Sequence, residues 1–392
     1  MEQNDRQEII GNDVLSNEQT NEQVNDEKSE KKIQDKGLSL PLTAFFIIGD
    51  IAGSGMLALP KAFDNAGFIG PVLLLLGALS SGYNGIRLGQ CWMIIKRRYP
   101  NLGEHIRNPY ATIGEKAFGS KMALIGIIAA MATIIATFTI SSDIIVYKVK
   151  HKPKLEFSNT KVVNLFLAFG TIMFAFGGTA TFPTIQHDMN KPEKFHISAT
   201  FSYIGILSMY QLVALLGYYT FGNQLVDNIL KSLSIGWLRY TSEILITIHL
   251  IFAFVINSNP VFQTVEHILK IPTNFNWKRC IIRTVVILFI IFVAETIPKF
   301  GALLSLVGGT STAFLTFVAP SMFYLKLCSS KGDWQEIKVP LHHKVICCQL
   351  MIIGTLGGIA TTYSAISTIS SSKTFFLPCY VNITAADLAV NP

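Results

Sequence analysis

Charge is what most of this chain lacks. Of its 57 charged residues, 15 lie in residues 1–36, which leaves 42 for the other 356 residues, or about 12 %, where a soluble domain carries roughly 25 %. Aromatic residues are absent from the first 44 positions, and all 43 of them follow. The composition is that of an acidic tail joined to a body too apolar for water. It excludes a soluble globular enzyme, a disulfide-rich scaffold and a DNA-binding domain.

The tail in turn lacks the apolar residues that folding requires. Residues 1–36 hold ten acidic and five basic residues and are rich in Asn, Gln, Glu and Lys. Such a segment cannot bury enough apolar surface to offset the entropy lost on ordering. It also lacks the apolar core of a signal peptide, so we expect the first hydrophobic span to act as an uncleaved insertion signal. Residues 1–38 are therefore predicted to form a disordered cytoplasmic tail.

The body contains long hydrophobic runs. A membrane helix needs ~20 mostly apolar residues to cross the hydrocarbon core. Nine stretches meet this requirement: 41–61, 68–95, 122–147, 162–187, 199–221, 237–258, 280–297, 301–327 and 344–370. We predict an all-α membrane protein, a polytopic bundle of about nine transmembrane helices within residues 39–371, followed by a short extracytoplasmic tail over residues 372–392.

The basic residues predict the orientation of these spans, because Lys and Arg are enriched in cytoplasmic loops. With the N-terminal tail inside, 21 Lys and Arg fall on the cytoplasmic side and 10 outside. The lysine-rich loop 148–161 falls outside and is the one anomaly. This orientation places the glycosylation sequon at Asn382 outside, although such sequons are common by chance.

Two of the predicted spans are interrupted by glycine and proline. The first reads GDIAGSGMLALP over residues 49–60, and the fourth reads FAFGGTATFP over residues 174–183. Glycine weakens a helix and lets its backbone approach a ligand, and proline ends the local hydrogen-bond ladder. Unpaired backbone at membrane depth is tolerated where it lines a cavity or is buried in protein, and a pair of such spans indicates a transporter's binding site. The alternative is close helix packing through small residues.

A broken helix offers two kinds of polar group to a ligand. The N-terminus of a half-helix presents free N–H groups suited to the carboxylate of an amino acid. Carbonyls at the opposite half-helix ends can hold an ammonium group or a coupling cation. The predicted substrate-binding residues are Gly53, Ser54, Gly55, Gly177, Gly178 and Thr179.

Several sequence strings resemble one known family, the amino acid/auxin permease or transmembrane amino acid transporter family. They are GDIAGSGMLALPKAFDNAGFIG at 49–70, YATIGEKAFG at 110–119, FLAFGTIMFAFGGTATFPTIQHDMNKPEKF at 166–195, NPVFQTVEHIL at 259–269 and AETIPKFGALLSLVGG at 294–309. The resemblance implies a fold like that of the bacterial leucine transporter, with two inverted five-helix repeats whose first helices are broken, plus one further helix.

The family pattern has eleven spans with breaks in the first and sixth, whereas here the breaks fall in the first and fourth. Five further spans follow the second break, as expected, but only three precede it. The family's third and fourth spans are therefore expected to be missing near residues 119–122, through alternative splicing or an incomplete gene model. Losing two spans keeps the orientation of the rest but removes a helix that usually forms a wall of the substrate pathway.

A few ionisable or hydroxyl side chains at membrane depth are candidates for ion coupling. Asp50 lies about one turn before Gly53, where a carboxylate is functional or else serves as a structural hydrogen-bond partner. The resemblance implies that the span containing Thr247 and His249 can face the first span, with Thr247 as an ion ligand; His249 either relays protons or packs as a neutral ring. His187 and Asp188 either form a gate salt bridge or end a helix in solvent.

The predicted function is secondary active transport of an amino acid by alternating access, coupled to Na⁺ or H⁺, and not an enzymatic activity. The alternative is an amino-acid-binding membrane sensor, or a regulatory truncated form, that does not transport; a channel is third. The expected partners are a small amino acid substrate and membrane lipids, with no nucleic acid, no metal and no cofactor beyond a coupling ion. The protein is expected in the plasma membrane or in a lysosomal or vesicular membrane.

Overall fold

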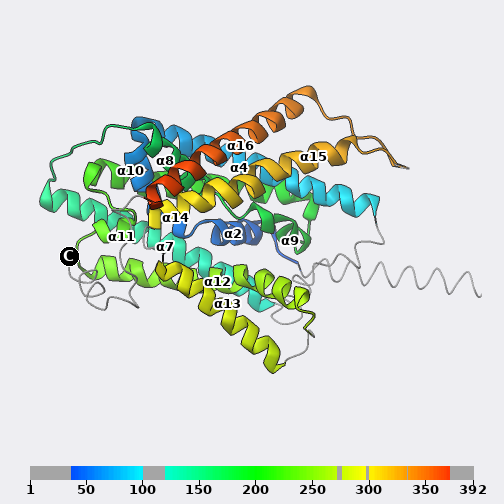
Figure 1. The fold of residues 1–392 in the computed structure, drawn as a ribbon, viewed down its shortest axis with the longest axis horizontal. Helices are drawn as coiled ribbons and strands as arrows, with labels where there is room; N and C mark the ends of the chain where they lie inside the picture. Colours follow the sequence, from blue (N-terminus) through cyan, green and yellow to red (C-terminus); the bar gives the residue numbers. More distant parts are fainter. Residues whose placement is uncertain (1–36, 100–119, 272–275, 297–299, 333, 371–392) are drawn as a thin grey trace, which may run out of the picture.

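The computed structural model describes residues 37–99, 120–271, 276–296, 300–332 and 334–370 of the chain (Figure 1). Residues 1–36 of the predicted N-terminal tail, the C-terminal tail with the sequon at Asn382, and the segment just before the expected gap at 119–122 lie outside the described residues. Their assignments stay predictions.

The described residues are almost entirely helical, which confirms the predicted all-α class. Besides helices, they form one isolated β-bridge, between Leu38 and Met189. In chain order the helices are α2 (Leu40–Ile51), α3 (Ser54–Ala66), α4 (Gly70–Arg98), α7 (Ser120–His151), α8 (Val162–Ala175), α9 (Phe182–His187), α10 (Phe195–Phe221), α11 (Ile229–Ser232), α12 (Trp237–Ile268), α13 (Trp277–Thr296), α14 (Phe300–Val307), the π-helix η5 (Gly308–Val318), α15 (Ala319–Ser329) and α16 (Leu341–Ser370).

Each of the nine predicted spans coincides with helix in the structure. Seven continuous helical stretches among the described residues are long and apolar enough to cross a membrane, with α3 and α4 counted as one. The helices of two of the nine predicted spans are not both long and apolar enough. α2 is only 12 residues long, and α13 carries Lys278, Arg279 and Arg283 within its first two turns. The polytopic membrane class is confirmed.

α10 packs against α2, α3, α4 and α7. Its apolar residues are distributed all around the helix; those on one stripe, including Phe201 and Ile204, are exposed, whereas the other faces are buried against neighbouring helices. Tyr210 and Tyr218 on this helix are among the largest fully buried side chains of the described residues, together with Phe63, Phe176 and Phe182. Tyr210, Phe176 and Phe182 lie next to the two helix interruptions, whereas Phe63 and Tyr218 pack against each other near the C-terminal end of α3.

Small residues allow the C-terminal helices to pack closely on α8. A Cβ atom on Gly308 would overlap the carbonyl of Gly170, and one on Gly358 would lie 2.6 Å from the carbonyl oxygen of Gly309. Such close contacts are typical of membrane helices, which gain no hydrophobic energy from associating in lipid. Gly308 and Gly309 also begin the π-helical stretch η5, and π-helical turns are frequent at functional sites.

α12 and α13 lie side by side at one edge of the molecule (Figure 1). No residue of α13 is buried in the described structure. Its apolar side chains Val285, Leu288 and Phe289 are between 57 and 64 % exposed. This edge therefore presents an apolar surface that the described part of the chain does not cover.

Candidate functional site

The first interruption falls at the predicted glycines. α2 ends at Ile51, the next residue Ala52 is extended, and α3 begins at Ser54. The Ala52 amide still bonds back to the Ile48 carbonyl at 2.8 Å, so the α2 ladder runs to the end of that half-helix. The Ile51 carbonyl and the first amides of α3 are left without the usual partners of a continuous helix.

The second interruption also falls where the sequence predicts it. α8 ends at Ala175, and helix resumes as the short 3₁₀ turn η2 (Thr179–Thr181), followed by α9. Gly178 between them has φ = 120°, in a region that residues with a Cβ rarely adopt. Glycine is therefore required at this point by the backbone itself.

The two interruptions lie against each other. A Cβ on Gly55 would lie 2.6 Å from the Cα of Ala175, so α3 and α8 touch backbone to backbone. A Cβ on Gly178 would lie 3.1 Å from the Asp50 Oδ2 atom, and the Thr181 hydroxyl donates to that oxygen at 2.6 Å. Asp50 is thus bound to the segment that follows the second break.

Tyr210 of α10 joins the ends of both upstream half-helices. Its hydroxyl lies 2.8 Å from the carbonyl oxygen of Ala175 and 3.1 Å from that of Ile51, the last residues of α8 and α2. One hydroxyl hydrogen serves two carbonyls, so each can take only part of it. Both carbonyl oxygens can therefore also accept a hydrogen bond from an ammonium group or bind a cation near them.

Two more contacts stabilise the second break. Ser81 of α4 donates to the Phe176 carbonyl at 3.2 Å and also lies 2.7 Å from the Tyr203 hydroxyl. Thr179 donates to the Thr316 hydroxyl of η5 at 3.0 Å. The predicted contact residues therefore divide into two groups: Gly178 faces the first break, whereas Thr179 is fully buried against η5.

His249 of α12 reaches the first break from the other side. Its Nε2 atom would lie 2.6 Å from a Cβ on Gly53, so the ring fills the space that the glycine leaves open. Its Nδ1 atom lies 2.8 Å from the Thr133 hydroxyl and 3.3 Å from the Ala129 carbonyl. Because Thr133 donates its own hydrogen to the Ala129 carbonyl at 2.9 Å, Nδ1 is the ring nitrogen that carries a proton. Nε2 is then an acceptor directed at the broken segment.

Thr247, the other predicted ion ligand on this helix, is placed differently. Its side chain is exposed, and its hydroxyl donates to the Glu243 carbonyl one turn back at 2.7 Å. A position two residues from His249 lies on another face of the helix, so the structure does not bring Thr247 to the breaks.

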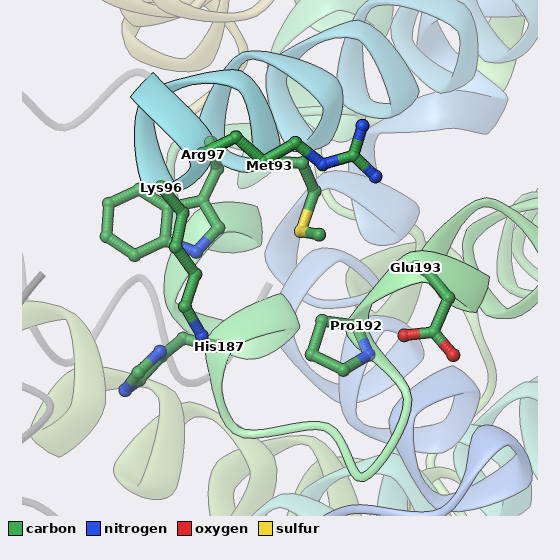
Figure 2. Close-up of a pocket in the computed structure, with 7 residues that line it drawn as sticks. Met93, Lys96, Arg97, His187, Pro192 and Glu193 are labelled. Carbon is green, nitrogen blue, oxygen red and sulfur yellow. The ribbon is translucent and has the colours of Figure 1, made fainter. Parts of the chain in front are cut away.

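The predicted gate residues lie at the far end of α9. The His187 ring contacts the Trp92 ring of α4 edge-on, with centroids 6.1 Å apart. The Asp188 carbonyl accepts from the Leu38 amide at 2.7 Å, and the Asn190 amide donates to the Leu38 carbonyl at 3.0 Å. The start of α2 is thereby joined to the end of α9, and His187 lines a cavity there (Figure 2).

Tyr210, Tyr203, Ser81, Thr181 and Thr316 are the residues around the breaks that sequence reasoning missed. Thr181 lies within the predicted motif and could have been included, because a hydroxyl near a break is a usual polar contact. Tyr210, Tyr203 and Ser81 lie in regular apolar helices and Thr316 in the π-helix η5. These four residues become adjacent to the breaks only through tertiary packing.

Comparison with known proteins agrees with this architecture. The family described as "Transmembrane amino acid transporter protein" matches residues 36–129 and 120–366. Amino acid transporter AVT3B of Arabidopsis thaliana is 27 % identical over 240 residues, which is 61 % of this chain and 54 % of that protein. Lysine histidine transporter-like 1 of the same plant is 30 % identical over 212 residues, covering 50 % of this chain and 46 % of that protein.

Auxin transporter-like protein 3 of Medicago truncatula is 30 % identical over 169 residues, which is 42 % of this chain and 36 % of that protein. The chain spans about half the length of the first two relatives. The family match covers most of the chain, and it confirms the resemblance drawn from the sequence strings. The chain belongs to the family of transmembrane amino acid transporter proteins.

Proposed function

We propose that this protein is a secondary active transporter that moves an amino acid across a membrane by alternating access. The observation that carries the proposal is the contact between the two helix breaks. They meet at Asp50, Gly178 and Thr181, with the carbonyls of Ile51 and Ala175 turned toward one tyrosine hydroxyl. Facing breaks at membrane depth bring together amides and carbonyls that have no partner within their own helix, which are the groups that a zwitterionic substrate needs.

The substrate is proposed to bind through its two charged ends. The N-terminus of α3 begins at Ser54 and supplies amides and the positive end of a 13-residue helix for the carboxylate. The carbonyls of Ile51 and Ala175 are suited to the ammonium group. Gly53 leaves room for the His249 ring, Gly55 lets α3 approach α8, and Gly178 lets the second break approach Asp50. Thr179 positions the second break through η5.

Coupling to a Na⁺ or H⁺ gradient is proposed to involve Asp50 and His249, which approach the first break from opposite sides. Asp50 is bound to the second break through Thr181, so a change in its charge alters a contact between the two broken helices. His249 presents Nε2 to Gly53 and can accept a proton there. The exposed placement of Thr247 gives it no part in this scheme. His187 and Asp188 are proposed to act at the cytoplasmic end, where α9 meets α2 and α4.

Two spans are proposed to be absent from the first half of the bundle. The family match comes in two stretches that meet at residues 120–129, close to the predicted gap. The uncovered face of α13 is also consistent with a missing neighbour. These observations favour a second candidate function, an amino-acid-binding sensor that cannot complete the transport cycle.

Purified full chain in proteoliposomes separates the two functions. Radiolabelled amino acids would be screened for binding, for uptake under imposed sodium or pH gradients, and for counterflow with unlabelled substrate inside. Counterflow together with gradient-stimulated uptake is the expected result. Saturable binding of an amino acid with no counterflow would overturn transport in favour of the sensor, and neither binding nor counterflow of any amino acid would overturn both.

A further inference from the structure

A cavity of about 250 Å³ lies at the end of α9 opposite the second break, between that end and α4 (Figure 2). One wall is α4, which contributes Lys96 and Arg97 together with Trp92 and Met93. The other wall contains His187 and the 3₁₀ turn η3 (Pro192–Lys194). Figure 2 shows Lys96 and Arg97 extending from α4 in different directions, Lys96 toward His187 and Arg97 toward the side of the view where Glu193 lies. Pro192 lies between the Lys96 and Glu193 side chains.

The charges around this cavity do not neutralise one another. The ion pairs found in the described part of the chain join Lys61 to Asp64, Arg239 to Glu243, and both Arg279 and Arg283 to Glu266. Lys96, Arg97 and Glu193 line one cavity as exposed side chains, with no such contact among them. A ligand complementary to all three would carry two negative groups and one positive group.

The place of the cavity in the bundle indicates where such a ligand comes from. α4 ends in the basic run Lys96, Arg97 and Arg98, at the cytoplasmic side in the predicted orientation. Trp92 lies one turn earlier, and tryptophan is enriched where membrane helices cross the headgroup region. Basic pockets between helices on this side of a membrane bind lipid headgroups.

We propose that this cavity binds the headgroup of an anionic aminophospholipid of the phosphoserine type. Its phosphate and carboxylate face Lys96 and Arg97, its ammonium group faces Glu193, and the glycerol region lies against Trp92 and Met93. A headgroup with one phosphate and no amino group matches only part of this arrangement. The cavity therefore selects by charge pattern as well as by net charge.

Occupancy of this site connects α4 to the half-helix that follows the second break. α9 is only six residues long and ends at His187, and Thr181, the hydrogen-bond donor to Asp50, comes directly before it. A bound headgroup holds the end of α9 against α4 and so stabilises the contact between the breaks. The lipid is expected to raise the melting temperature of the protein.

The test uses the full chain in nanodiscs of phosphatidylcholine doped with equal fractions of phosphatidylserine or phosphatidylglycerol, which has the same net charge but no amino group. Bound lipid is counted by native mass spectrometry, and the melting temperature is measured in parallel. We expect preferential binding of phosphatidylserine. We also expect about fivefold weaker binding for each of Lys96→Gln and Arg97→Gln, the loss that corresponds to about 1 kcal/mol per basic residue at an anionic surface.

Glu193→Gln is the discriminating variant, because it should reduce the preference for phosphatidylserine over phosphatidylglycerol without weakening the binding of phosphatidylglycerol. Lys191→Gln is the matched control, an exposed lysine of the same loop that does not line the cavity. Equal binding of both lipids by the unmodified protein would overturn the proposal in favour of general anionic attraction. If Lys191→Gln weakened phosphatidylserine binding as much as Lys96→Gln and Arg97→Gln do, the proposal would likewise be overturned in favour of general anionic attraction.

Two further arms exclude other occupants. Free O-phosphoserine that stabilises the protein as well as the lipid does would show that the ligand is water-soluble. A peptide of residues 1–25, with six acidic residues and one basic residue, would overturn the lipid assignment if it displaced phosphatidylserine and required Lys96 and Arg97. None of these readouts depends on transport, so the outcome is independent of the proposed function.

Discussion

Around the two helix breaks, polar groups are buried and paired, whereas at the α12–α13 edge apolar groups are exposed. Tyr210 and Tyr203 lie fully or almost fully buried and bond to the break region. By contrast, α13 has no buried residue in the described structure and packs on α12. Burying polar groups at the breaks costs free energy unless each of them is hydrogen-bonded, so the breaks should tolerate substitution poorly. The exposed side chains of α13 have few packing partners, so this edge should tolerate substitution well.

Adding one methyl group at either break is expected to have the largest effect. In Gly55→Ala the new Cβ would meet the Ala175 backbone at 2.6 Å, and in Gly178→Ala a residue with a Cβ must adopt φ = 120°. The overlap at residue 55 and the backbone strain at residue 178 each cost about 1–3 kcal/mol, and the displaced breaks should abolish uptake. Gly236→Ala is the matched control, because nothing lies within 4 Å of its Cβ position.

Uptake in proteoliposomes and melting temperature in detergent measure these effects. If Gly55→Ala and Gly178→Ala behave like Gly236→Ala in both assays, the two breaks are not closely packed and tolerate substitution as well as the open position at Gly236 does.

Asp50→Asn should separate coupling from folding. Asn has nearly the same size and still accepts the hydrogen bond from Thr181, so the fold should remain largely intact. The side chain can no longer change charge, so uptake should lose its stimulation by the coupling gradient while exchange of substrate down its own gradient survives. Uptake with and without imposed sodium or pH gradients measures the change, with Glu243→Gln as a control away from the breaks. Unchanged gradient stimulation would reduce Asp50 to a structural hydrogen-bond partner.

Tyr210→Phe removes the donor that the Ile51 and Ala175 carbonyls share. Leaving buried acceptors unsatisfied costs about 1–3 kcal/mol, and the melting temperature should fall accordingly. Tyr240→Phe on the exposed face of α12 should change it little, since that side chain is 54 % exposed. Equal shifts in the two variants would show that the Tyr210 hydroxyl does not stabilise the breaks.

The positions of the breaks could be predicted from the sequence because glycine and proline act locally. Gly53 and Gly178 are unfavourable in a helix whatever surrounds them, and both interruptions in the structure fall where the motifs place them. Most span boundaries could be predicted to within about five residues, because the length of an apolar run sets the span of a membrane helix. The exception is α12, which continues past the predicted end at residue 258 to Ile268.

The partners of the breaks could not be predicted, because they depend on helix rotation. Tyr210, Ser81 and Thr316 lie on three different helices, and no local pattern tells which face of an all-round apolar helix turns inward. The same uncertainty explains Thr247 and His249, which are two residues apart. The resemblance selected the helix correctly as one that approaches the first break, but only packing decides that His249 faces Gly53 and Thr247 does not.

Restoring two spans at the predicted gap tests whether the α12–α13 edge is exposed because neighbouring helices are missing. A segment from the corresponding part of AVT3B, inserted between residues 119 and 120, should cover part of the exposed α12–α13 surface. Packing and polar contacts between membrane helices contribute about 0.6 kcal/mol each, so we expect a melting temperature higher by a few degrees and faster uptake. Equal stability and equal uptake with and without the inserted spans would show that the α12–α13 edge faces lipid and lacks no neighbouring helix.

The smallest predicted effect concerns the polar end of the same edge. Glu266 of α12 accepts from Arg279 at 2.9 Å and from Arg283 at 2.7 Å, both on α13. Burial alone would raise the pKa of Glu266, but the hydrogen bonds and charges of Arg283 and Arg279 outweigh it and hold that pKa below its ordinary value. Because the folded pKa is depressed, the stabilisation is fully present above the unfolded value of about 4.3 and is lost as the pH falls through the folded pKa.

Glu266→Gln should therefore lower stability by about 1 kcal/mol or less at pH 7, the magnitude of a partly exposed ion pair, and should remove the corresponding acid-dependent loss. Because two arginines share one carboxylate, Arg279→Gln alone should cost less than Glu266→Gln, and the double variant should add little to Glu266→Gln. Melting temperatures of the three variants at pH 7 and below pH 4 complete this cycle. Additive losses would mean that Glu266 and Arg279 act independently, and that the ion pair between them does not help to hold α13 on α12.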